Sequence, residues 1–256
     1  MSLVVSRDFV LAYTQARRPT LVPEFTVRTA ADVVALWEAI QREHDTAGQA
    51  GCRQAAQVSN PPFWAAAWPG GQALARYVLD HPESVAFRTV LDLGSGSGLV
   101  ALAAARAGAS SVMASDVDPY CPAAIAVNAA ANDVTGIQVV GDVLDGDDVP
   151  DIEVILAGDV CYDRAMTERV LPFLHAAARR GCDVLLGDPD RAYLPRTGLE
   201  FVAAYDVPEV DAPTSRRTTV WRVRAARPMS SARPAGLNPD RSPTGGTPCA
   251  APCSPS

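Results

Sequence analysis

The sequence contains no lysine, so all 22 of its basic residues are arginine, and 29 acidic residues give a formal net charge of −7. This balance argues against a general nucleic-acid binder, because contact with a phosphate backbone requires a basic surface. The six cysteines form no C-x-x-C pair, and the three histidines lie far apart in the sequence. We therefore expect neither a metal site nor a disulfide framework, and a reducing compartment fits this cysteine usage best.

Long apolar runs are also missing. No stretch approaches the roughly 18 apolar residues that a membrane helix needs, and the first residues lack the charged and apolar regions of a signal peptide. We expect a cytoplasmic protein without a membrane or nucleic-acid partner. The hydrophobic fraction of 48% is sufficient for the buried core of a domain.

The composition divides the chain into three predicted parts. Residues 225–256 hold seven of the 21 prolines, and Leu237 is their only Leu, Ile, Val, Phe, Tyr or Trp. Such a segment buries too little apolar surface to offset the entropy of ordering, so we expect a disordered tail. Residues 1–70 are expected to form a helical extension and lid, and residues 71–224 the domain that carries the chemistry.

Strand patterns alternate with alanine-rich helical patterns along this domain. Runs rich in Val, Ile and Leu predict strands over residues 88–93, 111–116, 137–141, 152–157 and 183–187. Helices are expected over residues 31–44, 71–81, 99–107, 119–132 and 164–180. This alternation predicts a Rossmann-like α/β fold, with a mostly parallel sheet covered by helices on both faces. Two later strand patterns, residues 199–207 and 218–223, have no long helix between them and could pair antiparallel.

A glycine turn follows the first strand of the domain. Asp92 lies in the strand, and Gly94, Gly96 and Gly98 lead into a helix whose N-terminus offers free N–H groups to a ligand. A dinucleotide-binding pattern would need Gly or Ala where Leu99 stands, and the G-K-[ST] of a phosphate loop is absent. An ordinary strand-to-helix turn is the alternative. The D-x-G-x-G-x-G pattern resembles the first motif of class I S-adenosylmethionine-dependent methyltransferases.

Acidic residues follow the next two strands. Asp116 ends the second strand, where a carboxylate can accept hydrogen bonds from both hydroxyls of a cofactor ribose. Asp118 precedes Pro119 and is predicted to be a helix N-cap. Asp142 and Val143 follow the third strand and are candidates for contact with adenine, with an acidic surface turn as the alternative.

Asp159 and Tyr162 follow the fourth strand, beside the place where the reactive end of a cofactor would lie. A methyl-accepting amine must be neutral, and deprotonating lysine at pH 7 costs about 4.6 kcal/mol. A carboxylate and a phenol could accept hydrogen bonds from the amine, orient it and pass a proton to water. These two residues are therefore the candidate catalytic pair. The alternative for Asp159 is a cap for the helix that begins near Asp163.

Two tryptophans precede the first strand of the domain. Trp64 and Trp68 follow a polar linker, and this placement favours a wall or lid over the cofactor. Simple packing in the core is the alternative. Residues 187–191, after the fifth strand, are expected on the same rim.

The order and spacing of these motifs resemble the seven-β-strand protein methyltransferases, and among them the family of electron transfer flavoprotein beta subunit lysine methyltransferases in its bacterial form. Asp159 and Tyr162 match a D/E-x-x-Y/F motif after the fourth strand. The resemblance begins near Phe9, includes Leu21–Glu24 and ends near Trp221. Its segments are Trp68–Leu74, Leu91–Gly96, Asp116–Pro119, Gly158–Asp163, Gly187–Pro189 and Thr218–Trp221.

The resemblance implies a seven-strand sheet with the last strand antiparallel and S-adenosylmethionine as cofactor, with S-adenosylhomocysteine as product. The implied cofactor contacts are Trp68, Asp92, Gly94, Ser95, Gly96, Asp116, Asp142 and Val143. The glycine turn would face the methionine part, and Trp68 would close the pocket near the methyl donor. The implied substrate is lysine on the electron transfer flavoprotein beta subunit, methylated by a monomeric enzyme. N-methylation of a small amine or pyridine, or of a ribosomal protein, is the alternative, and a non-catalytic binding module is a third reading.

Overall fold

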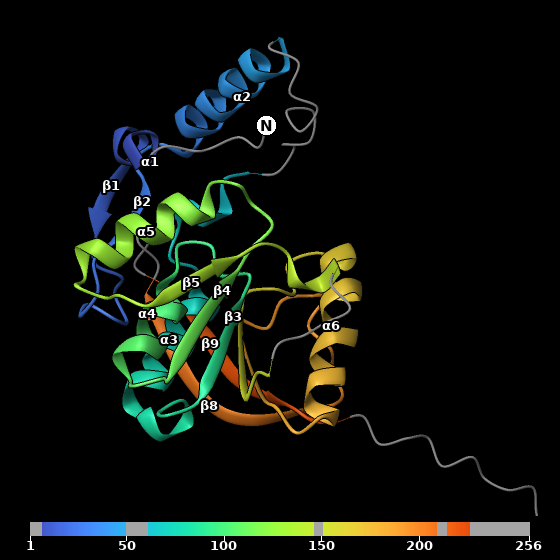
Figure 1. Ribbon diagram of the computed structural model, residues 1–256. Helices are drawn as coiled ribbons and strands as arrows, with labels where there is room; N and C mark the ends of the chain where they lie inside the picture. The colour runs from blue at the N-terminus through green and yellow to red at the C-terminus, as the bar shows by residue number, and fades with distance from the viewer. Residues whose placement is uncertain (1–6, 50–60, 146–150, 209–213, 226–256) are drawn as a thin grey trace, which may run out of the picture. The chain divides into compact units, whose positions relative to one another are not determined.

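The computed structural model describes residues 7–49, 61–145, 151–208 and 214–225 (Figure 1). The chain divides into a compact unit, Met1–Ala226, and a second unit, Arg227–Ser256. The second unit lies outside the described residues, as do residues 50–60 of the polar linker. The disordered tail therefore stays a prediction.

Seven strands of the described residues form one sheet in the order β5-β4-β3-β6-β7-β9-β8. Strands β3 to β7 pair in parallel, whereas β9 is antiparallel to both of its neighbours, β7 and β8. The predicted α/β fold with its last strand reversed is therefore confirmed. The strands are β3 (Thr89–Leu93), β4 (Ser111–Ser115), β5 (Ile137–Val140), β6 (Val154–Gly158), β7 (Asp183–Asp188), β8 (Leu199–Pro208) and β9 (Ser215–Val223).

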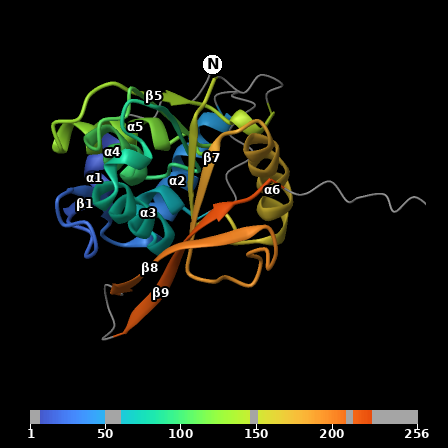
Figure 2. The same ribbon diagram turned by 90° about the horizontal axis from the view of Figure 1, so that it is seen from below.

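Alternate side chains of the central strands enter different hydrophobic layers, because successive residues of a strand point to opposite faces. Val90 and Val154 pack with α3, α4 and α5, while Leu91 and Ile155 pack with α6. Seen from below, α3, α4 and α5 lie on one side of the sheet and α6 on the other (Figure 2). These helices are α3 (Pro69–Asp80), α4 (Leu99–Arg106), α5 (Cys121–Ala131) and α6 (Arg164–Arg179).

The N-terminal part is helical only in part. A hairpin stands between its two helices, and α5 holds this hairpin through two buried asparagines. Asn128 Oδ1 accepts a hydrogen bond from the Arg28 N–H at 2.8 Å, and Asn132 bonds both the N–H and the carbonyl of Thr26. The sequence did not predict the hairpin, whose strands are short and largely polar. The elements are α1 (Arg7–Tyr13), β1 (Thr14–Arg17), β2 (Val27–Ala30) and α2 (Val33–Gln49).

Three glycines allow the first turn of α3 to lie directly against the ends of β6 and β7. A Cβ atom at Gly70 would lie 2.2 Å from the Gly187 carbonyl oxygen, and one at Gly187 would lie 2.3 Å from the Gly70 oxygen. A Cβ at Gly158 would lie 2.9 Å from the backbone of Gly71. No side chain fits between these backbones, so the segment before α3 is fixed beside the carboxyl ends of the strands.

We expect Gly70→Ala to lower the free energy of unfolding by about 3 kcal/mol, because the added methyl group meets backbone that cannot move without shifting a helix or a strand. Gly141→Ala is the matched control, since a Cβ there meets nothing within 4 Å. Urea denaturation of both variants measures the difference. Equal stability of Gly70→Ala and the control would show that this contact is not tight.

Candidate functional site

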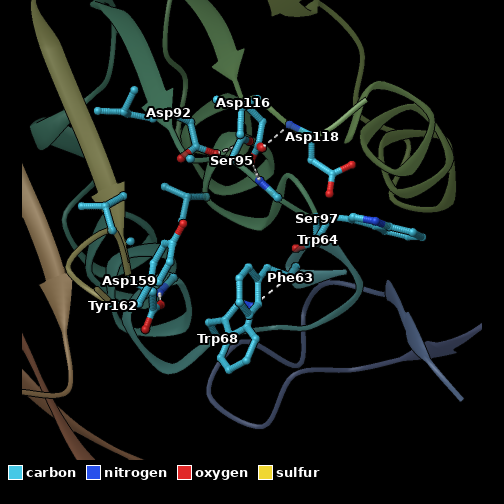
Figure 3. A pocket seen from close by; sticks show the side chains of 18 of the residues that line it. Phe63, Trp64, Trp68, Asp92, Ser95, Ser97, Asp116, Asp118, Asp159 and Tyr162 are labelled. Atoms are coloured by element: carbon cyan, nitrogen blue, oxygen red, sulfur yellow. Dashed lines mark hydrogen bonds between the residues drawn. The ribbon is translucent and has the colours of Figure 1, made fainter. Parts of the chain in front are cut away.

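A cavity of about 290 Å³ lies at the carboxyl ends of β3, β4 and β6. This edge is where ligands bind in open α/β sheets, and the volume is close to the roughly 300–1,000 Å³ typical of small-molecule sites. Figure 3 shows Asp92 of β3 near Asp116 and Asp118, which follow β4. The aromatic side chains of Phe63 and Trp68 lie below them. The predicted site residues that line the cavity are Trp68, Asp92, Gly94, Ser95, Gly96, Asp116, Asp142, Asp159 and Tyr162.

The glycine turn has a backbone shape that requires glycine. Gly94, Gly96 and Gly98 have φ angles of 69°, 51° and 82°, in the left-handed region that side chains disfavour. Asp92 is buried and accepts hydrogen bonds from Ser95 Oγ at 2.5 Å and from the Ala101 N–H at 3.0 Å. Burial raises the pKa of Asp92 to about 7. This carboxyl therefore shapes the turn and anchors the first turn of α4.

Asp116 connects the glycine turn after β3 with the loop after β4. Its Oδ2 accepts a hydrogen bond from the Gly96 N–H at 2.8 Å, and its Oδ1 accepts one from the Asp118 N–H at 3.0 Å. A carboxylate offers about four acceptor positions, and the Cys121 thiol also interacts with the Asp116 carboxylate. The contact of Asp116 with ribose hydroxyls stays a prediction.

Asp118 does not occupy the predicted N-cap position. The N-cap of α5 is Tyr120, and the Asp118 carboxylate accepts the Tyr120 N–H at 2.8 Å, one short turn before the helix. Burial, with a smaller contribution from the nearby Asp116 carboxylate, raises the pKa of Asp118 to about 6. Asp118 thus adds a further carboxyl beside Asp116 to the wall of the cavity.

The loop after β5 holds the two candidates for contact with adenine, and this contact stays a prediction. Asp142 lines the cavity and forms an ion pair with Arg169 of α6 at 2.5 Å. Val143 does not line the cavity, and both Val143 and Leu144 pack against the hydrophobic layer that includes α6. Leu144 lines the cavity in its place. Arg169 was not predicted, since no local pattern in a helix marks an arginine as the partner of a distant loop.

Asp159 stands at the centre of a charged network. Its φ angle is 60°, it is only 8% exposed, and its Oδ2 accepts the Gly71 N–H at 2.8 Å. Its Oδ1 pairs with Arg191 at 2.5 Å, and the same guanidinium lies 3.2 Å from the fully buried Asp188. Burial raises the pKa of Asp159 to about 6, although Arg191 opposes this shift. Arg191 was expected on the rim from its place after the fifth predicted strand, without a role of its own.

Four aromatic residues line the cavity: Phe63, Trp64, Trp68 and Tyr162. Trp68 is 40% exposed and donates its indole N–H to the Phe63 carbonyl oxygen at 2.7 Å. The Tyr162 ring is half-buried and lies 5.4 Å from the ring of Phe63. Trp64 is almost completely buried and stacks on Tyr120 with an interplanar angle of 4°. Trp64 therefore packs in the core and also borders the cavity, whereas Trp68 lines the cavity and is partly exposed.

A metal site and a membrane-spanning helix are both absent from the residues that the structure describes. Among them, no group of three or more His, Cys, Asp or Glu side chains is placed to hold a metal ion. No helix in the same ranges has the length and apolar character needed to cross a membrane.

This sheet order, with its reversed last strand, glycine turn after β3 and carboxylate after β4, defines a class I methyltransferase, the class that uses S-adenosylmethionine. Residues 72–160 match the family model described as ribosomal protein L11 methyltransferase (PrmA). A solved structure of ribosomal protein L11 methylase from Lactobacillus delbrueckii subsp. bulgaricus aligns with a TM-score of 0.45 and 22% identity, covering 60% of this chain and 78% of that one.

Curated relatives identify the family within this class. The electron transfer flavoprotein beta subunit lysine methyltransferase of Xenopus laevis is 34% identical over 194 residues, which cover 75% of this chain and 73% of the relative. The Danio rerio protein of the same name is 40% identical over 153 residues, covering 58% of this chain and 59% of the relative. The chain therefore belongs to the electron transfer flavoprotein beta subunit lysine methyltransferase family. The match to the Danio rerio protein spans about three fifths of its length.

Proposed function

We propose that the protein is a protein-lysine N-methyltransferase that transfers methyl groups from S-adenosylmethionine to lysine side chains of the electron transfer flavoprotein beta subunit. The observation that carries this proposal is one cavity in which the glycine turn and Asp116 lie together with Asp159 and Tyr162. The names of the relatives supply the acceptor. A cytoplasmic location, a monomeric state and the three-part division of the chain stay predictions.

The residues present fit this cofactor. Gly94 and Gly96 bring bare backbone to the cavity, and the Asp116 carboxylate, which also lines it, would accept hydrogen bonds from ribose hydroxyls. Asp142, Leu144 and Trp68 also line the cavity. Asp142 and Leu144 would contact adenine, and Trp68 would cover the methionine end. When bound, S-adenosylmethionine supplies a methyl group on a sulfonium sulfur, which keeps the electron pair of the broken bond.

Asp159 and Tyr162 would bind and orient the acceptor amine. At pH 7 the Asp159 carboxyl is mostly ionised, because its pKa is about 6. Gly71 and Arg191 use one acceptor position on each of its oxygens, so positions remain for N–H groups of a lysine amine. Asp159 and Tyr162 would orient the nitrogen lone pair towards the methyl carbon. The proton lost by the amine then passes to water through these polar groups.

An acceptor comparison tests this function. The protein is incubated with methyl-labelled cofactor and, separately, with purified electron transfer flavoprotein, ribosomal protein L11 or a metabolite extract. We expect the flavoprotein beta subunit to take up most label. Ribosomal protein L11 is the second candidate, because residues 72–160 match the model of its methyltransferases. Preferred labelling of L11 or of a metabolite would overturn the proposed acceptor.

Arg191 is expected to set the pH dependence of catalysis. Asp159 must be ionised to accept hydrogen bonds from the amine, so kcat of the wild type should rise with pH through about 6. Arg191→Gln removes the charge that lowers this pKa, and the rise should move about one pH unit or more higher. A kcat profile from pH 5 to 9 measures this shift.

Arg196→Gln is the matched control for this profile. Arg196 lies five positions further along the same loop, is exposed and pairs only with the exposed Asp190 in the described structure. It should keep the wild-type profile, since exposed ion pairs contribute little. Identical profiles for Arg191→Gln and the wild type would show that the pKa of Asp159 does not control the reaction.

A further inference from the structure

We propose that Phe63, Trp68 and Tyr162 form an aromatic collar that binds the charged head of the acceptor lysine as a cation. This proposal rests on the proposed function and deepens it, because it assigns how the same site recognises its substrate. Aromatic rings attract ammonium and methylammonium groups through the negative charge of their faces. The collar would therefore hold a lysine head both before and after methyl groups are added.

The three rings come from two segments that are distant in the sequence. Phe63 and Trp68 precede α3, and their ring centroids are 5.8 Å apart in an edge-to-face arrangement. Tyr162 follows β6, and its ring centroid lies 5.4 Å from that of Phe63. All three line the cavity that also contains Asp159, and Figure 3 shows them on the side away from Asp116 and Asp118.

The collar is both held in place and open to a substrate. The hydrogen bond from the Trp68 indole to the Phe63 carbonyl fixes one aromatic residue relative to the other. Trp68 remains 40% exposed and Phe63 38% exposed, although large aromatic side chains are usually buried. Two exposed aromatics beside a catalytic carboxylate are placed to receive a side chain from solvent.

The carboxylates next to the collar already form ion pairs with an arginine, so we expect the rings to contribute most of the cation binding. Asp159 is already paired with Arg191, and Asp188 lies against the same guanidinium, so the negative charge of these carboxylates is partly balanced. A trimethylated lysine head also has no N–H to donate to a carboxylate. Ring faces bind such a head without hydrogen bonds.

A variant of Phe63 tests cation binding separately from the roles expected for Trp68 and Tyr162, because the Phe63 side chain carries no polar atom. The variant Phe63→Leu keeps an apolar side chain of similar bulk and removes only the ring. Phe201→Leu is the matched control, since Phe201 is 59% exposed on β8, contacts Trp221 and does not line the cavity.

The test compares two small probes of equal shape. Acetyl-trimethyllysine amide carries the cation, and its carbon isostere, with a tert-butyl group in place of trimethylammonium, is neutral. We measure Kd for both by NMR titration with S-adenosylhomocysteine present. The wild type should bind the cation at least about five-fold more tightly, and Phe63→Leu should lose most of this preference while Phe201→Leu keeps it.

Equal binding of the two probes by the wild type would overturn the collar, as would a Phe63→Leu variant that keeps the full preference. This readout needs no protein acceptor and no methyl transfer. If the flavoprotein is not methylated but the cation preference is present, the proposed acceptor fails and the collar stands. If the flavoprotein is methylated without any cation preference, the collar fails and the proposed function stands.

Discussion

Asp159→Asn should lower kcat for methyl transfer about 10²- to 10⁴-fold, the range found when a positioned acid or base is removed. The asparagine keeps the size of the side chain and one acceptor oxygen for the Gly71 N–H. It also tolerates the left-handed backbone, since Asn adopts a φ near 60° more readily than most residues. What it loses is the negative charge that would hold and orient the amine.

Equilibrium and kinetic measurements separate this loss from a structural effect. The Kd for S-adenosylmethionine should change little, because the cofactor contacts lie on β3, β4 and β5. Asp133→Asn is the matched control: Asp133 has a φ of 54° and is exposed outside the cavity. A kcat for Asp159→Asn within about three-fold of wild type would remove Asp159 from the mechanism.

Asp116→Asn should raise the Kd for S-adenosylmethionine about 100-fold. Hydrogen bonds to a charged group contribute roughly 1.5–3 kcal/mol, against about 1 kcal/mol for neutral pairs, and two ribose hydroxyls are involved. An asparagine has only one acceptor oxygen, whereas the two oxygens of Asp116 accept hydrogen bonds from the Gly96 and Asp118 N–H groups. The variant therefore has fewer acceptor positions left for the ribose hydroxyls. Isothermal titration with cofactor measures the effect.

The same Asp133→Asn control applies, since it also removes one carboxylate charge, from an exposed residue outside the cavity. Its affinity for cofactor should equal that of the wild type. An unchanged affinity in Asp116→Asn would mean that the ribose lies elsewhere, and the assignment of the cofactor site to the ends of β3 and β4 would be wrong. A protein that no longer folds is recognised by its denaturation curve.

The parts of the molecule that the sequence predicted are those set by local pattern. Buried runs such as Val154–Gly158 read as strands because every residue is apolar or small. The glycine turn was predictable because three glycines follow the strand at positions that need left-handed backbone. The missing helix between the two late strands indicated that they could pair antiparallel, and the family resemblance implied that the last strand is reversed.

The parts that the sequence did not predict depend on contacts between distant segments. Arg191 and Arg169 neutralise acids that lie 32 and 27 positions away in the chain, and no spacing rule marks such pairs. Val143 and Leu144 are similar apolar residues, so only the direction of the loop decides which one faces the cavity. The first hairpin depends on Asn128 and Asn132, whose hydrogen-bond partners lie 100 and 106 positions earlier in the chain.

The central claim is that this chain methylates lysine in the electron transfer flavoprotein beta subunit. Peptide mass spectrometry after incubation with a deuterated-methyl cofactor tests it most directly. The chain itself has no lysine, so any deuterated methyllysine must belong to the acceptor. We predict such methyllysine in the beta subunit with the wild type and almost none with Asp159→Asn. A wild type that binds the cofactor and leaves every lysine of the flavoprotein unmodified would contradict the account.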